Sequence, residues 1–319
     1  MRKVVVLSKE PNAFGYETEI LKQFTDVDFI ISPATLENEV IEAIQDAEVV
    51  LFTATKMNER VINSLKKCKL IIRYGIGYDN VDLTAAANRG IYVCNAPNYG
   101  VIDVAEHALS LILATAKKTL NMHMRAQNGS WGPGNSAPFY RLAGKTIGFV
   151  GFGNIGRALC KMTNGLSMKP VVYDPFVSDK IISEYGAEKS SLEDLFKNSD
   201  FVSLHLPLNE KTRHSIGKEL LTKMKKTAIL INTSRGPIIN ENELIDILDQ
   251  GLIAGVGLDV FENETIPLDE RLTKSPRAVL TPHVAWNTDV AVTAIHEEVG
   301  DNVARYLKGE RPHSIVNKL

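Results

Sequence analysis

The 319-residue chain has few cysteines, no long apolar run and no large excess of charge of either sign. Its three cysteines, Cys68, Cys94 and Cys160, have no metal-ligand spacing, so we expect reduced thiols, no metal site and a cytoplasmic location. The net charge of -2 argues against binding to nucleic acid or to an anionic membrane. No apolar run approaches the ~20 residues of a membrane-spanning helix, and the run at residues 4–7 is too short for a signal peptide.

What is present is the composition of an ordinary globular protein, with length for two domains of roughly 100–200 residues each. Short Val- and Ile-rich runs alternate with helical patterns in both halves of the chain. This alternation predicts parallel sheets covered by helices on both faces. Strands are predicted at residues 4–7, 27–31, 49–53, 70–74, 145–150, 170–173, 201–204, 228–232, 253–258 and 278–280.

A long helix is predicted between the two series, from about residue 101 to 124, with apolar side chains on more than one face. The following segment, residues 128–135, is rich in Gly, Pro and Asn and predicts a loop that carries Trp131 outside any core pattern. We interpret helix and loop as the interface of a homodimer, because aromatic anchors are enriched at interfaces. The alternative is a loop that packs on its own domain.

A glycine-rich segment, GFGNIG at residues 151–156, follows a predicted strand and opens a predicted helix. This pattern is typical of the dinucleotide-binding Rossmann domain, where the glycines allow a tight turn, close approach of the backbone to the pyrophosphate, and close packing of helix on strand. The helix N-terminus offers free N–H groups to the anion. The residues predicted to bind the pyrophosphate are Gly151, Gly153, Asn154, Ile155 and Gly156.

An acidic residue is expected about 20 residues further on, at the end of the next strand. Asp174 stands there, after the strand at residues 170–173. A carboxylate at this position binds the ribose hydroxyls and repels a 2′-phosphate, which favours NAD over NADP. The alternative is a structural glycine turn followed by an unrelated surface aspartate.

Further motifs follow one another along nearly the whole chain: GIGYDNVD at residues 75–82, VAEH at 104–107, HLPL at 205–208, NTSRG at 232–236, LDVFE at 258–262 and TPH at 281–283. With these motifs the chain resembles the D-isomer-specific 2-hydroxyacid dehydrogenases. The resemblance implies an NAD-dependent enzyme that transfers hydride between nicotinamide and C2 of a small 2-keto or 2-hydroxy acid. It also implies an α/β fold of two doubly wound parallel-sheet domains. These are a Rossmann NAD-binding domain at residues 99–286 and a discontinuous, flavodoxin-like substrate domain at residues 1–98 and 287–319, with the active site in the cleft between them.

The resemblance assigns catalysis to Arg235, Glu264 and His283. The planar guanidinium of an arginine matches a carboxylate, and a histidine, with an unperturbed pKa of about 6.5, can protonate a ketone oxygen near neutral pH. A neighbouring glutamate orients the imidazole and favours its charged form. His283 follows Thr281 and Pro282, and we expect an extended backbone there.

The glutamate stands in an acidic stretch, and from the residues alone Glu262, Asp269 or Glu270 could also be the partner of the histidine. The resemblance selects Glu264 by its spacing from Asp259. The family usually has proline directly after this glutamate, whereas this chain has Thr265, with Pro267 two residues later, so the local turn is expected to differ.

The resemblance places other residues around the two ligands. A tryptophan at the position of Trp286 resembles a subgroup of hydroxypyruvate reductases and C-terminal-binding-protein corepressors. The alternative for Trp286 is an aromatic side chain of the core. The alternative for Arg73 is a charged side chain on the surface. The predicted substrate-binding residues are Arg73, Gly75, Ile76, Gly77, Arg235, His283 and Trp286, and the further cofactor-binding residues are His205, Pro207, Thr233 and Asp259.

The favoured substrates are hydroxypyruvate and glyoxylate, as in a glycerate dehydrogenase, with pyruvate as a further candidate. A second possible function, of a different class, is that of an NAD(H)-sensing corepressor that binds partner proteins. A third possible function is that of a short-form phosphoglycerate dehydrogenase. Formate dehydrogenase is disfavoured, because its histidine pairs with glutamine where this chain has Glu264.

Overall fold

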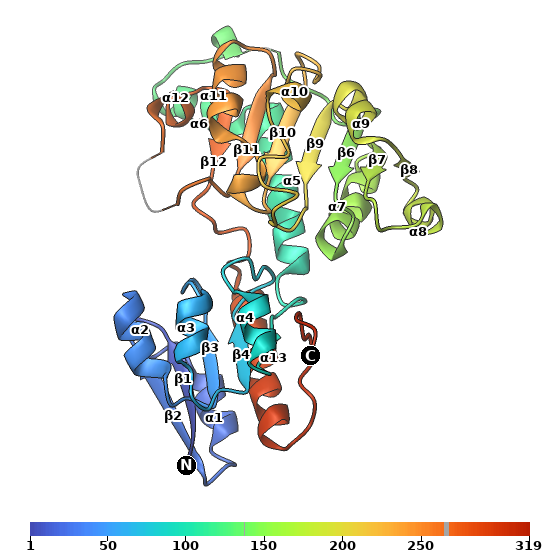
Figure 1. The fold of residues 1–319 in the computed structure, drawn as a ribbon. Coiled ribbons are helices and arrows are strands. Elements are labelled where there is room, and N and C mark those ends of the chain that lie inside the picture. Colours follow the sequence, from blue (N-terminus) through green and yellow to red (C-terminus); the bar gives the residue numbers. More distant parts are fainter. Residues whose placement is uncertain (137, 265–267) are drawn as a thin grey trace. The chain divides into compact units, whose positions relative to one another are not determined.

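The computed structural model describes residues 1–136, 138–264 and 268–319, which divide into two compact units (Figure 1). Unit 1 comprises Met1–Gly100 and Asn287–Leu319, and unit 2 comprises Val101–Trp286. The sequence had placed the two crossings after residues 98 and 286.

Unit 1 is built on a five-stranded parallel sheet in the order β2-β1-β3-β4-β5, which is the flavodoxin-like order. Along β1, Val4 and Val6 pack with α1 and α13, whereas Val5 and Leu7 pack with α2, α3 and α4, as the two-residue period of a strand requires. Both faces of the sheet are therefore covered. The elements are β1 (Arg2–Leu7), α1 (Gly15–Leu21), β2 (Val27–Ser32), α2 (Glu37–Ile44), β3 (Val49–Phe52), α3 (Glu59–Ser64), β4 (Leu70–Arg73), α4 (Leu83–Asn88), β5 (Tyr92–Cys94) and α13 (Asp289–Leu307).

Unit 2 is built on a seven-stranded parallel sheet in the order β12-β11-β10-β9-β6-β7-β8. This is the Rossmann order, extended by one strand at the β12 edge. One core joins a face of the sheet to α5, α7 and α8, and a second core joins the other face to α9, α10, α11 and α12 (Figure 1). The elements are α5 (Val101–Lys117), α6 (Thr119–Gln127), η1 (Gly134–Ser136), β6 (Thr146–Val150), α7 (Asn154–Gly165), β7 (Lys169–Tyr173), α8 (Asp179–Glu184), β8 (Glu188–Lys189), α9 (Leu192–Asn198), β9 (Phe201–Leu204), α10 (Lys218–Leu221), β10 (Ile229–Asn232), η2 (Gly236–Ile238), α11 (Glu241–Asp249), β11 (Gly255–Leu258), α12 (Glu270–Thr273) and β12 (Ala278–Leu280).

The carboxyl ends of neighbouring strands in the unit 2 sheet lie in register. Ligands of open α/β sheets bind outside these ends, most often where the strand order reverses, here between β6 and β9. Every candidate residue of unit 2 follows one of these ends closely in the sequence. The paired terminal residues, from β7 across to β12, are Tyr173, Val150, Leu204, Asn232, Leu258 and Leu280.

The single long helix predicted over residues 101–124 is wrong, because α5 ends at Lys117 and α6 begins at Thr119. Lys118 between them has a left-handed backbone with φ of 53°. Lysine is a good helix former, so nothing local indicates the break. It accompanies tertiary contacts instead: the N–H of Tyr140 donates to the Ala116 carbonyl at 3.0 Å, and Lys117 Nζ donates to the Tyr140 carbonyl at 2.7 Å. The predicted burial of this helix on several faces is also wrong for α6, which buries none of its residues.

Two leucines of α7 provide a test of the core assignment. Leu159 is fully buried, whereas Leu166, the C-cap residue, is 36% exposed. We expect Leu159→Ala to lower the free energy of unfolding by about 2–5 kcal/mol, because it leaves a cavity in the core. Leu166→Ala is the matched control and should cost about 0.5 kcal/mol or less. Urea denaturation followed by circular dichroism measures both, and equal losses would contradict the assignment.

Candidate active site

The glycine-rich segment forms a tight turn between β6 and α7. Gly151 has φ of 91°, and a Cβ at this position would lie 2.6 Å from the carbonyl oxygen of His205. Gly153 is the N-cap of α7, has no side-chain cap, and has open space where a Cβ would be. A Cβ at Gly156 would lie 2.9 Å from the Gly151 carbonyl oxygen, so this glycine allows the helix to pack against the turn. The N-terminus of α7 therefore has no side-chain cap, and uncapped N–H groups at a helix start are the donors that a pyrophosphate requires.

Asp174 is bound to the same turn. Its Oδ2 accepts a hydrogen bond from the Phe152 N–H at 2.8 Å, and its Oδ1 accepts from the N–H groups of Phe176 and Val177 at 2.8 and 3.1 Å. A carboxylate has about four lone-pair sites, so further acceptor capacity remains for hydroxyl groups. The acid and the glycine turn thus form one rigid unit at the ends of β6 and β7.

His205 lies behind the glycine turn as a packed side chain. Its Nε2 is 2.9 Å from Ser203 Oγ, and its ring stacks on Phe149. Burial lowers the pKa of His205 to about 4, so the imidazole is neutral at neutral pH. His205 therefore offers shape and its backbone carbonyl rather than a charge.

Two other predicted cofactor residues lie at the same edge of the sheet. Pro207 is exposed after the end of β9, and Thr233 is buried directly after β10. Among the described residues, Thr233 Oγ1 is a buried hydroxyl with no hydrogen-bond partner. A buried orphan of this kind is expected where a ligand supplies the missing partner. The uncapped α7 N-terminus, Asp174 and this hydroxyl together fit a dinucleotide.

Arg235 is presented by a turn that the buried Asn232 builds. The Asn232 Oδ1 accepts from the N–H and hydroxyl of Ser234 at 3.0 and 2.7 Å, and its Nδ2 donates to the Arg235 carbonyl at 2.9 Å. The guanidinium Nη1 donates to the Ser234 carbonyl at 2.8 Å. These hydrogen bonds fix the backbone on which Arg235 stands, directly after the end of β10.

Gly236 brings the Arg235 turn against the loop that carries Glu264. A Cβ at residue 236 would lie 1.9 Å from the carbonyl carbon and oxygen of Phe261 and 2.6 Å from the Glu262 nitrogen. These obstacles are backbone atoms, so no side-chain movement can relieve the clash. Only glycine permits this contact between the ends of β10 and β11.

Glu264 and His283 form a hydrogen-bonded pair, with Glu264 Oε2 2.7 Å from His283 Nδ1. The other carboxylate oxygen accepts from the Phe261 N–H at 3.3 Å. Burial alone would raise the pKa of Glu264, but the hydrogen bond and charge of His283, the Phe261 N–H and the charge of Arg235 together lower it. The carboxylate is therefore ionised near neutral pH, and the ring Nε2 is the nitrogen left for a substrate.

His283 does not have the extended backbone that we expected, because its φ is 55°. Such a left-handed conformation is uncommon for histidine and persists only where the surroundings hold it. The fully buried Asp259 provides that hold. Its carboxylate accepts from the N–H groups of Val284 and Ala285 at 3.0 and 2.9 Å and from Thr281 Oγ1 at 2.6 Å, and its carbonyl accepts from the His283 N–H at 2.8 Å.

Two larger side chains pack against the His283 turn. His107 of α5 places Nε2 2.9 Å from Thr281 Oγ1 and 3.5 Å from Asp259 Oδ1, so its contacts are with the residues that hold the turn. The indole N–H of Trp286 donates to the His283 carbonyl at 3.1 Å. Trp286 therefore lies against the turn itself.

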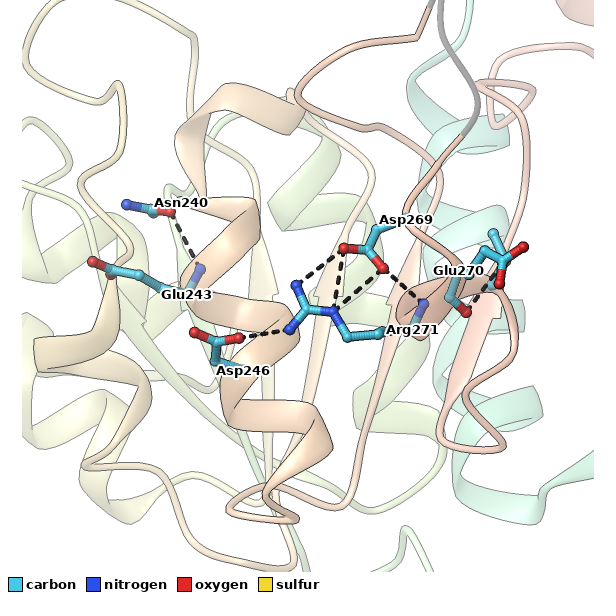
Figure 2. Close-up of polar contacts among 7 residues, drawn as sticks. Asn240, Glu243, Asp246, Asp269, Glu270 and Arg271 are labelled. Atoms are coloured by element: carbon cyan, nitrogen blue, oxygen red, sulfur yellow. Dashed lines mark hydrogen bonds and ion pairs between the residues drawn. The ribbon is translucent and has the colours of Figure 1, made fainter.

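Hydrogen bonds and ion pairs hold the chain on both sides of Glu264. Before Glu264, the Glu262 N–H donates to Glu241 Oε2 at 2.9 Å, and Glu262 Oε1 lies 2.6 Å from His214 Nε2. After it, Arg271 binds Asp269 and also donates to Asp246 of α11 at 2.9 Å, so α12 is tied to α11 (Figure 2). Thr265 and Pro267, the departure from the family pattern, lie outside the described residues.

The other acidic candidates for the histidine partner are engaged elsewhere. Glu262 contacts His214, Asp269 contacts Arg271, and Glu270 accepts from Lys274 Nζ at 2.6 Å. Among these carboxylates, Glu264 is the one that contacts His283.

The predicted substrate residues of unit 1 form a loop at the carboxyl end of β4. Gly75 has φ of 139°, and the guanidinium of Arg73 fills the space that a Cβ would need, with Nη1 1.7 Å from that position. Arg73 Nε donates to the Thr53 carbonyl at 3.2 Å, and Asn95 Nδ2 donates to the Ile76 carbonyl at 2.7 Å. The loop through Gly77 is thus held by side chains on both of its flanks.

The predicted residues therefore fall into two groups, and each group is compact within its own unit. Asn232, Gly236 and His214 had not been selected from the sequence. The glycine directly after Arg235 was an available signal, because an isolated glycine at a strand end often marks a close backbone contact. His214 had no local signal, because its partner Glu262 is remote in the sequence.

Comparison with known proteins places the chain in a family. Residues 109–285 match the family described as D-isomer specific 2-hydroxyacid dehydrogenase, NAD binding domain. The glyoxylate reductase of Thermococcus litoralis is 38% identical over 308 residues, which cover 94% of this chain and 93% of that protein.

Solved structures show the same relationship. A glyoxylate reductase from Paecilomyes thermophila has a TM-score of 0.91 at 27% identity and covers 99% of this chain and 98% of its own. The D-lactate dehydrogenase from Aquifex aeolicus, complexed with NAD and lactic acid, has a TM-score of 0.86 at 28% identity and covers 96% of each chain.

These findings confirm the predicted doubly wound α/β fold, the NAD cofactor and the activity of an NAD-dependent 2-hydroxyacid dehydrogenase. The chain belongs to the D-isomer specific 2-hydroxyacid dehydrogenase family.

Proposed function

We propose that the chain reduces glyoxylate and hydroxypyruvate to the corresponding 2-hydroxy acids with NADH. The observation that carries this proposal is the Glu264–His283 pair beside Arg235, at the ends of three adjacent strands. The similarity to glyoxylate reductases supports the choice of substrate. The bulky indole of Trp286 against the His283 turn favours keto acids with small side chains.

In this proposal, Arg235 holds the substrate carboxylate through its planar fork, and bound NADH supplies the hydride to C2. His283 gives the proton on Nε2 to the ketone oxygen during reduction and takes it back during oxidation. Glu264 keeps the ring oriented and favours imidazolium, and Asp259 positions the turn that carries His283.

The remaining predicted roles stay proposals. The α7 N-terminus and its turn, from Gly151 to Gly156, would hold the pyrophosphate, Asp174 the ribose, and His205, Pro207, Thr233 and Asp259 would line the cofactor. The N–H groups of Gly75, Ile76 and Gly77, with Arg73 above them, would contribute to binding the substrate carboxylate.

The experiment that tests the proposal is NADH oxidation with a panel of 2-keto acids: glyoxylate, hydroxypyruvate, pyruvate and 3-phosphohydroxypyruvate. We expect the highest kcat/KM for glyoxylate or hydroxypyruvate. A preference for the phosphorylated substrate would instead favour a short-form phosphoglycerate dehydrogenase. Absence of turnover with all four, despite NADH binding, would favour a corepressor-type binding protein.

We expect His283→Ala to lower kcat/KM for reduction by about 10²–10⁴-fold, the usual scale of general acid–base catalysis. NADH affinity should change little, since the imidazole is proposed to contact the substrate. Steady-state kinetics and NADH fluorescence titration measure the two quantities, with the exposed His313→Ala as the control. A variant with parental kcat/KM would remove His283 from the mechanism.

We expect Glu264→Gln to shift the pH dependence of reduction. The lowered pKa of Glu264 keeps the carboxylate charged above mildly acidic pH, where it favours imidazolium. Glutamine carries no charge at any pH, so the variant should have a lower kcat/KM than the parent near neutral pH, and the fall in kcat/KM that protonation of Glu264 causes in the parent at acidic pH should be absent from the variant. Profiles of both directions between pH 5 and 9, a window of about two units on either side of neutrality, provide the measurement. Superimposable profiles would show that the charge has no catalytic effect.

We expect Gly236→Ala to lower kcat/KM by about 10²-fold, because a methyl group would push the Phe261–Glu262 backbone away and misplace Glu264 by a fraction of an ångström or more. Gly165→Ala in α7 is the matched control, since a Cβ there meets nothing within 4 Å. Kinetics are compared at equal folded fractions, checked by circular dichroism. Equal activity of the two variants would contradict the role given to the close contact.

We also propose a homodimer, with its interface narrowed from the predicted residues 101–124 and 128–135 to α6 and the loop after it, because α5 packs into the core of unit 2. Leu120, Met124 and Trp131 are 50%, 57% and 89% exposed there, and large exposed apolar side chains are the kind of surface that a protein interface buries. Light scattering at micromolar concentration should give twice the 35.2 kDa of one chain. Met124→Lys with Trp131→Ser should reduce the mass to that of a monomer, and a monomeric parent would refute the proposal.

A cytoplasmic location remains a prediction, supported by three buried, free cysteines. Within the described ranges, no helix has both the length and the apolar character needed to cross a membrane.

A further inference from the structure

A carboxylate, a phenol and an imidazole meet in the interior of unit 1. Glu17 of α1 is fully buried, and its Oε1 accepts from the Tyr74 hydroxyl at 2.7 Å and lies 2.8 Å from Nδ1 of His296 on α13. Phe14 packs edge-on against the rings of both Tyr74 and His296. Three elements that are remote in the sequence thus converge on one carboxylate.

This cluster is costly for a purely structural contact. Glu17 Oε2 is buried and has no hydrogen-bond partner among the described residues. Burying a carboxylate with one unsatisfied oxygen is unfavourable, and an apolar side chain of similar volume would stabilise the interior at lower cost. Such an exception requires an explanation other than packing.

The position of Tyr74 indicates what the cluster holds. Tyr74 stands between the end of β4 and the loop through Gly75 and Gly77, and its N–H donates to the Phe52 carbonyl at 2.8 Å. Gly75, the next residue, turns the chain with φ of 139°. The Tyr74 ring is therefore the last anchored side chain before the loop leaves the sheet.

The hydroxyl that makes this anchor stays a donor. Burial, followed by the charge and hydrogen bond of Glu17, raises the pKa of Tyr74 well above its ordinary value. The imidazole of His296 supplies the second contact to Oε1, so Tyr74 alone does not have to satisfy the carboxylate.

We propose that Glu17, Tyr74 and His296 are positioning residues that fix the N–H groups of the Gly75–Gly77 loop for the substrate carboxylate. This inference rests on the proposed function, because it assumes that the loop binds substrate. The cluster acts on substrate affinity and leaves hydride transfer at saturation unchanged.

The test compares two tyrosines of unit 1 that each donate to a glutamate. Tyr74→Phe removes the hydroxyl under the loop, whereas Tyr306→Phe removes the hydroxyl that donates to Glu48 Oε1 at 3.1 Å, directly before β3 and so at the opposite end of the strands. We expect Tyr74→Phe to raise KM for glyoxylate about tenfold, because the N–H groups of the loop would no longer be held in position for the substrate carboxylate. The kcat and the NADH Kd should stay parental. Tyr306→Phe should lower Tm without changing KM.

Hydrogen exchange gives a readout that does not depend on activity. Amides of the peptide that covers Gly75–Gly77 should exchange faster in Tyr74→Phe than in the parent or in Tyr306→Phe. Equal exchange in all three proteins would overturn the proposal, and so would faster exchange with an unchanged KM. If the parent reduces no 2-keto acid, the proposed function fails, while the exchange comparison still decides whether the cluster holds the loop.

Discussion

The buried carboxylate of Asp259 is the interaction on which the candidate active site depends. It binds two consecutive backbone N–H groups and the Thr281 hydroxyl, and thereby stabilises a left-handed turn that His283 would not adopt by itself. With the turn held, Nδ1 of His283 meets Glu264 and the ring cannot rotate freely. The side chain buried at the end of β11 thus accepts from three donors, and the same bonds set the orientation of the proposed acid.

Close backbone contacts at glycine complete the arrangement. Gly151 lets the β6 turn lie against the His205 carbonyl, and Gly236 lets the β10 turn lie against Phe261. Both contacts join the ends of neighbouring strands, where the parallel register already brings the chain segments to one edge. The register of the sheet brings the ends of neighbouring strands to the same level. The glycines then allow the two backbones to come into contact, which a side chain would prevent. The proposed cofactor and catalytic residues of unit 2 therefore lie at one edge of its sheet.

Unit 1 uses a different device for its loop. The guanidinium of Arg73 lies against Gly75, and the Tyr74 hydroxyl donates a hydrogen bond to Glu17. Both units thus place a buried carboxylate behind a short turn at a strand end, Asp259 in one and Glu17 in the other. In each case polar groups are kept in the interior despite their desolvation cost, and in unit 2 their hydrogen bonds hold the left-handed backbone of His283, which local preference would not select.

From the amino-acid sequence alone, the alternation of strands and helices, the glycine turn with Asp174, and the family motifs carrying Arg235 and His283 could be identified, because each is a pattern of neighbouring residues. The short elements α4, β5, α8, β8 and α12 were not predicted. The break at Lys118, the left-handed His283, and the pairs His214–Glu262 and His296–Glu17 were also missed. Each of these depends on a partner distant in the chain, and a long-range contact leaves no local signal. The sequence by itself determined the sheets and the chemistry at their edges, whereas only tertiary packing decided which side chains meet and which backbone conformations they hold.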